Sequence, residues 1–162
     1  MSNKQEKTEL YAIIRIRGTV NVQQKVKETL KMLRVERPNY MTLIPNSSSY
    51  RGMLKKAKDT ITWGEINKDV LVHVLKKRGQ LEGRNPLTDE YLKENTDYES
   101  ISAFADALLA GTVSLKDIPT MKQFFRLHPA RKGYRGVKRG FAEGGELGYR
   151  GIAINPLIVR MA

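Results

Sequence analysis

The chain has 162 residues, of which 40% are apolar and 28% charged, and its formal net charge is +12 at pH 7. It has no cysteine, which excludes disulfides, thiolate chemistry and cysteine zinc sites, and no apolar run is long enough to span a membrane. The sequence pI of about 10.0 favours nucleic acid or an anionic membrane surface as the partner.

Residues 1–66 have the pattern of a small α+β core. Apolar residues alternate from Leu10 to Ile16, which predicts a strand, and Pro38 requires an extended start to a second one. Asn21 is a candidate helix N-cap, and so is a serine of the turn after Pro45. Gly64 weakens the third strand. The predicted order is strand 10–17, helix 22–34, strand 39–44, helix 48–59 and strand 60–66.

Residues 67–120 predict a helical extension with an acidic face. Asn67 is expected to cap the first helix and Gly111 to end the last one. Residues 121–162 predict a basic arm, a glycine-rich turn over 144–151 and a closing strand over 152–161, which Pro156 confines to a sheet edge or divides. The predicted helices of the extension run from 67 to 78, from 88 onward, and from 100 to 110.

The basic arm is the most informative stretch. Seven cations and no carboxylate lie between Lys122 and Ala142. Pro129 and three glycines interrupt any helix or strand there, and the rings of Tyr134 and Phe141 lie between the charges. Fixed positive charge with stacking faces suits RNA, whereas the alternative is a solvated loop. We expect the arm to be disordered until RNA binds, because its apolar content is small.

The positive charge is divided unevenly along the chain. The net charge is +10 over residues 1–78, −5 over 79–120 and +7 over 121–162. Two basic surfaces facing phosphate and an acidic one turned away are therefore expected. His128 could contact a base or phosphate, or cap the turn. The predicted RNA-binding residues are Arg15, Arg17, the two helical stripes Lys27, Lys31, Arg34 and Arg51, Lys55, Lys58, and the arm residues Arg126, His128, Arg131, Lys132, Tyr134, Arg135, Lys138 and Arg139.

Nothing in the sequence predicts an enzyme. There is no phosphate-binding loop and no HExxH zinc motif. His73 lies within an apolar helix and is interpreted as a half-buried structural residue, and the carboxylates of 82–106 as a solvated face. Gly145, Gly148 and Gly151 are interpreted as a turn.

Three segments resemble a known family: RIRGTVNVQQKVKETLKMLR, NSSSYRGMLKKAKDTITWGEI, and FRLHPARKGYRGVKRGFAEGGELGYRG with INPLIVRM. They are similar to the large-subunit ribosomal protein family called L-thirty in bacteria and archaea and L-seven in eukaryotes, in its long archaeal-type form. Ala130 stands where eukaryotic relatives often have a second proline, which affects the local turn.

The resemblance implies a ferredoxin-like β-α-β-α-β core with an antiparallel sheet and helices on one side. It further implies a structural constituent of the large subunit, monomeric within the cytoplasmic ribosome, without catalytic residues or cofactor. The implied partners are large-subunit rRNA near the 5S RNA region and neighbouring ribosomal proteins. Family contacts would fall at Arg17-Gly18, at Tyr50-Arg51-Gly52, which adds Tyr50 to the RNA-binding residues, and on the arm.

Two alternatives belong to other classes. A small-molecule-binding regulatory module of ferredoxin-like shape would pair through its sheet edges and need a neutral pocket. An RNA-processing enzyme would depend on His128. The first of them has no use for the cations of the arm.

Overall fold

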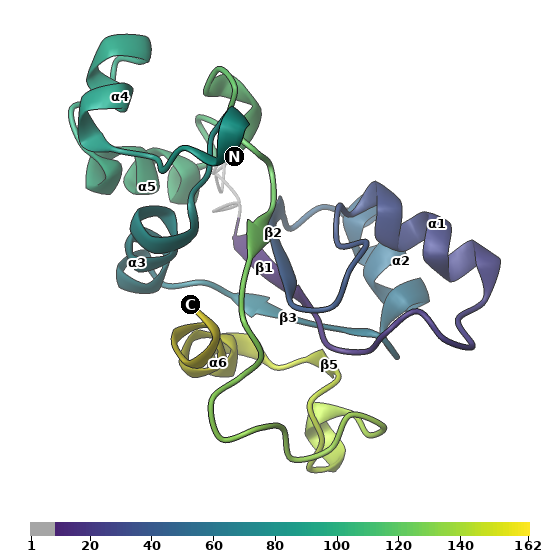
Figure 1. The fold of residues 1–162 in the computed structure, drawn as a ribbon. Helices are drawn as coiled ribbons and strands as arrows, with labels where there is room; N and C mark the ends of the chain where they lie inside the picture. The colour runs from purple at the N-terminus through teal and green to yellow at the C-terminus, as the bar shows by residue number, and fades with distance from the viewer. Residues whose placement is uncertain (1–8) are drawn as a thin grey trace, which may run out of the picture.

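The computed structural model describes residues 9–162, and a sheet of five strands lies at its centre (Figure 1). Residues 1–8 of the predicted core lie outside the described residues. In the order in which they lie side by side, the strands are β4 (Phe125–Arg126), β2 (Tyr40–Pro45), β1 (Leu10–Arg15), β3 (Ile61–Glu65) and β5 (Gly148–Tyr149).

The middle strand β1 is antiparallel to both of its neighbours, as the resemblance implies. Ile13 lies opposite Thr42 of β2 and Trp63 of β3. Because side chains alternate along a strand, Tyr11 and Ile13 lie on one face and Ile14 on the other. All three are buried. The predicted alternation is confirmed, and both faces of the sheet must therefore be covered.

Helices α1 (Gln24–Met32) and α2 (Ser48–Ala57) cover the face that carries Ile13. Their buried side chains include Leu30 and Leu54, which fall on one side of each helix at helical spacing. The two core helices pack against each other on the same side of the sheet, as the resemblance implies.

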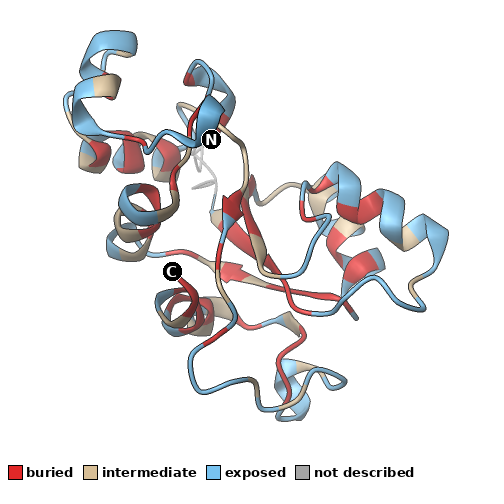
Figure 2. Cartoon of the chain, viewed as in Figure 1, coloured by how far each residue is buried: buried red, intermediate tan, exposed pale blue. Residues whose placement is uncertain are grey.

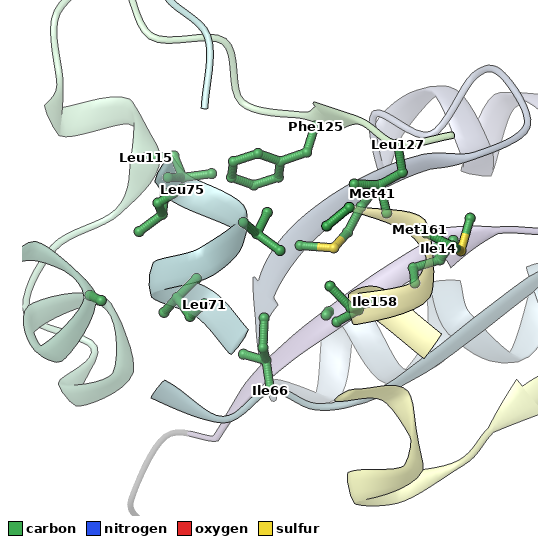
Figure 3. Close-up of a cluster of buried hydrophobic side chains, with 14 of the residues drawn as sticks. Ile14, Met41, Ile66, Leu71, Leu75, Leu115, Phe125, Leu127, Ile158 and Met161 are labelled. Carbon is green, nitrogen blue, oxygen red and sulfur yellow. The ribbon is translucent and has the colours of Figure 1, made fainter. Parts of the chain in front are cut away.

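The opposite face is covered by helices from later in the chain (Figure 1). Helices α3 and α6 lie near the strands, and α5 packs on α3. Figure 3 shows Ile14 and Met41 of the sheet meeting Leu71 of α3 and Ile158 of α6 in the larger hydrophobic cluster. These helices are α3 (Lys68–Arg78), α4 (Asp89–Asn95), α5 (Ile101–Ala110) and α6 (Ile154–Met161).

The predicted helix starts are confirmed where a serine caps the helix. Ser47 accepts a hydrogen bond from the Tyr50 amide at 3.4 Å, and Ser100 caps α5 in the same way. The helix predicted over 22–34 is shorter at both ends, because Asn21 and Arg34 have left-handed backbone conformations with φ near 60° and 61°.

The strand predicted over 152–161 is wrong, because this segment forms a short turn followed by helix α6. Its buried residues Ile154, Leu157, Ile158 and Met161 recur at helical spacing on one side. Pro156 lies in the first turn, where a missing amide proton removes no helical hydrogen bond. Its position is therefore compatible with a helix start as well as with a strand edge.

The turn predicted over 144–151 contains the short strand β5, which runs parallel to β3. The Arg150 amide donates to the Trp63 carbonyl at 2.9 Å, and the Thr62 hydroxyl donates to the Gly148 carbonyl at 2.8 Å. The far end of the basic arm is thereby joined to the core sheet.

Gly64 is needed for this junction. A Cβ atom on Gly64 would lie 2.0 Å from the backbone oxygen of Gly151, which is far inside any tolerated contact. The glycine that weakens the predicted strand thus permits the return of the arm.

We therefore expect Gly64→Ala to lower the free energy of unfolding by about 3 kcal/mol or more, because backbone must move to admit the methyl group. Gly52→Ala is the matched control, since Gly52 lies inside α2 with no atom within 4 Å of the position that its Cβ would occupy. That change should stabilise the helix by about 0.5–1 kcal/mol. Urea unfolding measures both, and equal effects of the two substitutions would contradict the account.

Candidate nucleic-acid interface

The two helical stripes are exposed, as predicted. Lys27 and Lys31 lie one turn apart in α1, and Arg51 and Lys55 lie one turn apart in α2. Arg34 and Lys58 follow the ends of these helices and are exposed too. Tyr50 is only half-buried, and the Arg51 Nε donates to the Asn46 side-chain oxygen at 2.9 Å.

None of the stripe cations is neutralised within the described part of the chain. Over residues 9–162 the ion pairs are Lys68–Asp106 and Glu146–Arg150. Arg17 is also exposed. These cations are therefore available to an external anion.

Arg15 is a correction to the predicted interface. Its side chain is 2% exposed, and its guanidinium donates to the backbone oxygens of Arg17, Val35 and Glu36. Burial lowers the pKa of Arg15. The alternation of β1 places this side chain on the face covered by α1 and α2, where its hydrogen bonds hold the α1–β2 connection.

The basic arm leaves β4, runs over the surface and returns at β5. Leu127 and Ala130 are buried near its start, and residues 131–139 are mostly exposed (Figure 2). At the start of the arm, Arg126 lies over the Phe124 ring at 5.7 Å. The exposed cations of the arm are Arg126, Arg131, Lys132, Arg135, Lys138 and Arg139.

A buried ion pair holds the far end of the arm. The Arg150 Nη2 lies 2.6 Å from the Glu146 Oε2, and both side chains are almost fully buried. The Arg150 Nε also donates to the Thr62 hydroxyl at 2.8 Å, and its guanidinium lies 4.9 Å from the centre of the Phe141 ring. The other oxygen of Glu146 accepts from the Arg135 amide at 3.0 Å.

This environment sets the charge of Glu146. Burial alone would raise the pKa of the carboxyl group. The Arg135 amide and the Arg150 guanidinium outweigh that effect, and they hold the pKa of Glu146 below its usual value. The pair was missed in the sequence. The sequence pattern that could have indicated the pair is Glu146 four residues before Arg150, in a stretch with few acids.

His128 and Tyr134 are half-buried and have polar partners within the fold. The two ring nitrogens of His128 lie 2.9 and 3.0 Å from the carbonyl oxygens of Pro129 and Ala162. The Tyr134 hydroxyl donates to the Asn39 side-chain oxygen at 3.2 Å, and its ring packs on the larger cluster. Both side chains fasten the arm to the core, because their polar atoms already have protein partners.

The start of the arm packs against the core. The arm carries buried side chains such as Leu127 and Ala130, and its backbone is hydrogen-bonded to the end of α6 through His128 and Arg131. The arm therefore buries more apolar surface in the folded protein than its composition suggests. Ordering of the exposed stretch 131–139 on RNA stays a prediction.

The acids of the extension are mostly exposed on α4, α5 and the loops beside them. No group of three or more His, Cys, Asp or Glu residues within 9–162 is placed to hold a metal ion. In the same range, no helix has both the length and the apolar surface that crossing a bilayer demands.

Comparison with known proteins points to one family. The family model described as ribosomal protein L30p/L7e matches residues 11–61. The large ribosomal subunit protein uL30 of Methanocorpusculum labreanum is 46% identical over 152 residues, which are 94% of this chain and 99% of the relative. That of Archaeoglobus fulgidus is 49% identical over the same shares. That of Nanoarchaeum equitans is 51% identical over 93% of this chain and 97% of the relative.

The lowered pKa of Glu146 predicts a pH-dependent arm. A carboxyl group with a lowered folded pKa contributes stability that is complete above its unfolded pKa of about 4.3. That stability is lost as pH falls through the folded pKa. In NMR spectra recorded between pH 7 and pH 3, the amide chemical shifts of Arg135 and Leu147 should change as the arm is released.

Glu146→Ala removes one partner of the buried pair and should cost about 3–5 kcal/mol of unfolding free energy at pH 7. Glu143→Ala is the matched control, since Glu143 is an exposed acid of the same loop. An acid-induced change that persists unaltered in the Glu146 variant would show that another group controls the arm.

Proposed function

The chain belongs to the ribosomal protein L30p/L7e family, and from this premise we propose that its exposed cations bind large-subunit rRNA. It is a structural constituent of the large ribosomal subunit and not an enzyme. Its partners are accordingly rRNA and other ribosomal proteins, and its place is the cytoplasmic ribosome. The alternative of a small-molecule regulatory module has no support in the family.

The proposal rests on a division among the cations of this protein. Some are buried and bonded within the fold, whereas others are exposed and without a carboxylate partner in the described part of the chain. Arg15 and Arg150 are buried and hydrogen-bonded within the fold. The cations of the two stripes and the arm are exposed, and within residues 9–162 they form no ion pair. A protein that binds a polyanion needs exposed charges free of internal carboxylates, because each one can then replace a condensed counterion.

We assign the RNA-facing surface to the core 1–66 and the arm within 121–162. The proposed contacts are Arg17, Lys27, Lys31, Arg34, Tyr50, Arg51, Lys55, Lys58, Arg126, His128, Arg131, Lys132, Tyr134, Arg135, Lys138 and Arg139. The extension 67–120 is proposed to turn away, since its acids would repel phosphate. Contact near the 5S RNA and a monomeric state within the subunit are further parts of this proposal.

Removing arm cations should weaken rRNA binding and flatten its salt dependence. The triple variant Lys132→Ala, Lys138→Ala, Arg139→Ala should lower the slope of log K against log salt by about one unit per lost phosphate contact, and so by up to about three. Filter binding to purified large-subunit rRNA from 50 to about 200 mM salt measures the slope.

The charge-matched control is Lys76→Ala, Lys77→Ala, Lys93→Ala, which removes three exposed cations from α3 and α4. It should leave the slope nearly unchanged. Equal losses in the two triple variants would mean that net charge alone drives binding and that the arm has no special role.

A further inference from the structure

A hollow of ≈ 480 Å³ lies along the outer edge of β2. Leu33, at the end of α1, lines one part of it, and Leu115, in the short helix that follows α5, lines another. These two leucines belong to the hydrophobic clusters on opposite faces of the sheet. The hollow therefore encloses the edge of the strand between two apolar walls.

The edge of β2 is open at Leu43. The Asn46 amide donates to the Glu9 carbonyl at 2.9 Å, so the alternation of an antiparallel pair turns the backbone groups of Leu43 away from β1. Strand β4 pairs with β2 only at Tyr40 and Met41.

The segment just before β4 does not pair with β2. Continuing the register would bring Gln123 opposite Leu43, but the Lys122 amide donates to the Gln80 carbonyl at 2.9 Å instead. Figure 1 shows this segment coming to β4 from the side of α5. The outward N–H and C=O of Leu43 thus make no backbone hydrogen bond with the described segment 121–124, and such groups readily pair with an added strand.

The hollow continues towards the acidic extension. A second hollow of ≈ 290 Å³ shares Val113 and Asp117 with the first and is also lined by Asp97 and Tyr98. Arg34 and Lys116 lie on the lining of the first hollow only. The far end therefore carries two carboxylates, Asp97 and Asp117, in a segment whose net charge is −5 over residues 79–120. One oxygen of Asp117 accepts from the Ser114 amide at 2.7 Å, which leaves the other oxygen for a partner.

We propose that this edge docks an extended, cationic segment of a neighbouring protein of the large subunit, an inference that rests on the proposed function. The segment pairs with the free backbone groups of Leu43, as in strand addition to a sheet edge. An apolar side chain packs between the two leucine walls, and Lys or Arg side chains reach Asp97 and Asp117. RNA fits poorly at the far end of this site, because its phosphates would meet the same carboxylates.

The test places a photoreactive residue at Val113, which lines both hollows, in large subunits purified from cells that express the variant. The control position is Val159, which is exposed on α6 and lines neither hollow. Irradiation should join position 113, and not 159, to a protein whose crosslinked peptide maps by mass spectrometry to a non-helical stretch rich in Lys and Arg.

Charge reversal sharpens the test. Asp97→Lys should lower the crosslink yield at position 113 by about tenfold, since like charges would now meet. Glu90→Lys, an exposed acid of α4 outside both hollows, should leave the yield unchanged. A crosslink to RNA, to an acidic or helical segment, or to nothing overturns the docking inference while the protein still sediments with the subunit. Absence from the subunit overturns the proposed function itself.

Discussion

The buried Glu146–Arg150 pair fixes the basic arm to the core, and the interface depends on it. Two charges have left water there, which is costly unless every polar group finds a partner. Thr62, the Phe141 ring and the Arg135 amide complete the surroundings of the pair. Because Thr62 belongs to β3, the arm is tied to the strand beside the centre of the sheet. The exposed cations of residues 131–139 are then carried on a loop anchored at both ends, which reduces the entropy lost on binding.

The cations of this protein fall into two groups, one bonded within the fold and one exposed to solvent. Arg15, Arg150 and Arg160 donate to backbone or side-chain oxygens of the fold. The lysines and arginines of the stripes and the exposed part of the arm have no carboxylate partner within residues 9–162. The acids outside the Glu146–Arg150 pair lie largely on the helical extension, away from the arm in sequence. Acids such as Glu28 and Asp59 lie near the stripes, but within residues 9–162 they form no ion pair with these cations.

Much of the fold follows from the sequence because its signals are local. The alternation around Ile13 and the serine caps at Ser47 and Ser100 specify elements without help from distant residues. Two failures share one cause, which is that tertiary context decided them. The eight residues of α6 carry a pattern that suits a helix or a strand. Arg15 looks like any surface arginine until α1 and β2 are seen to enclose it. The hydrogen bonds of His128 to the end of α6 and of Tyr134 to Asn39 depend on the same context. The exposure of the stripe and arm cations could be predicted, because no carboxylate within residues 9–162 pairs with them.

The most direct measurement is an electron cryomicroscopy map of the large subunit that contains this chain. The account predicts that Lys132, Lys138 and Arg139 lie within hydrogen-bond distance of phosphate oxygens, at about 3 Å. It also predicts that Arg15 and Arg150 keep their internal partners and that α4 and α5 face away from RNA. A map in which the arm cations face solvent or protein carboxylates, while the acidic extension lies against rRNA, would contradict it.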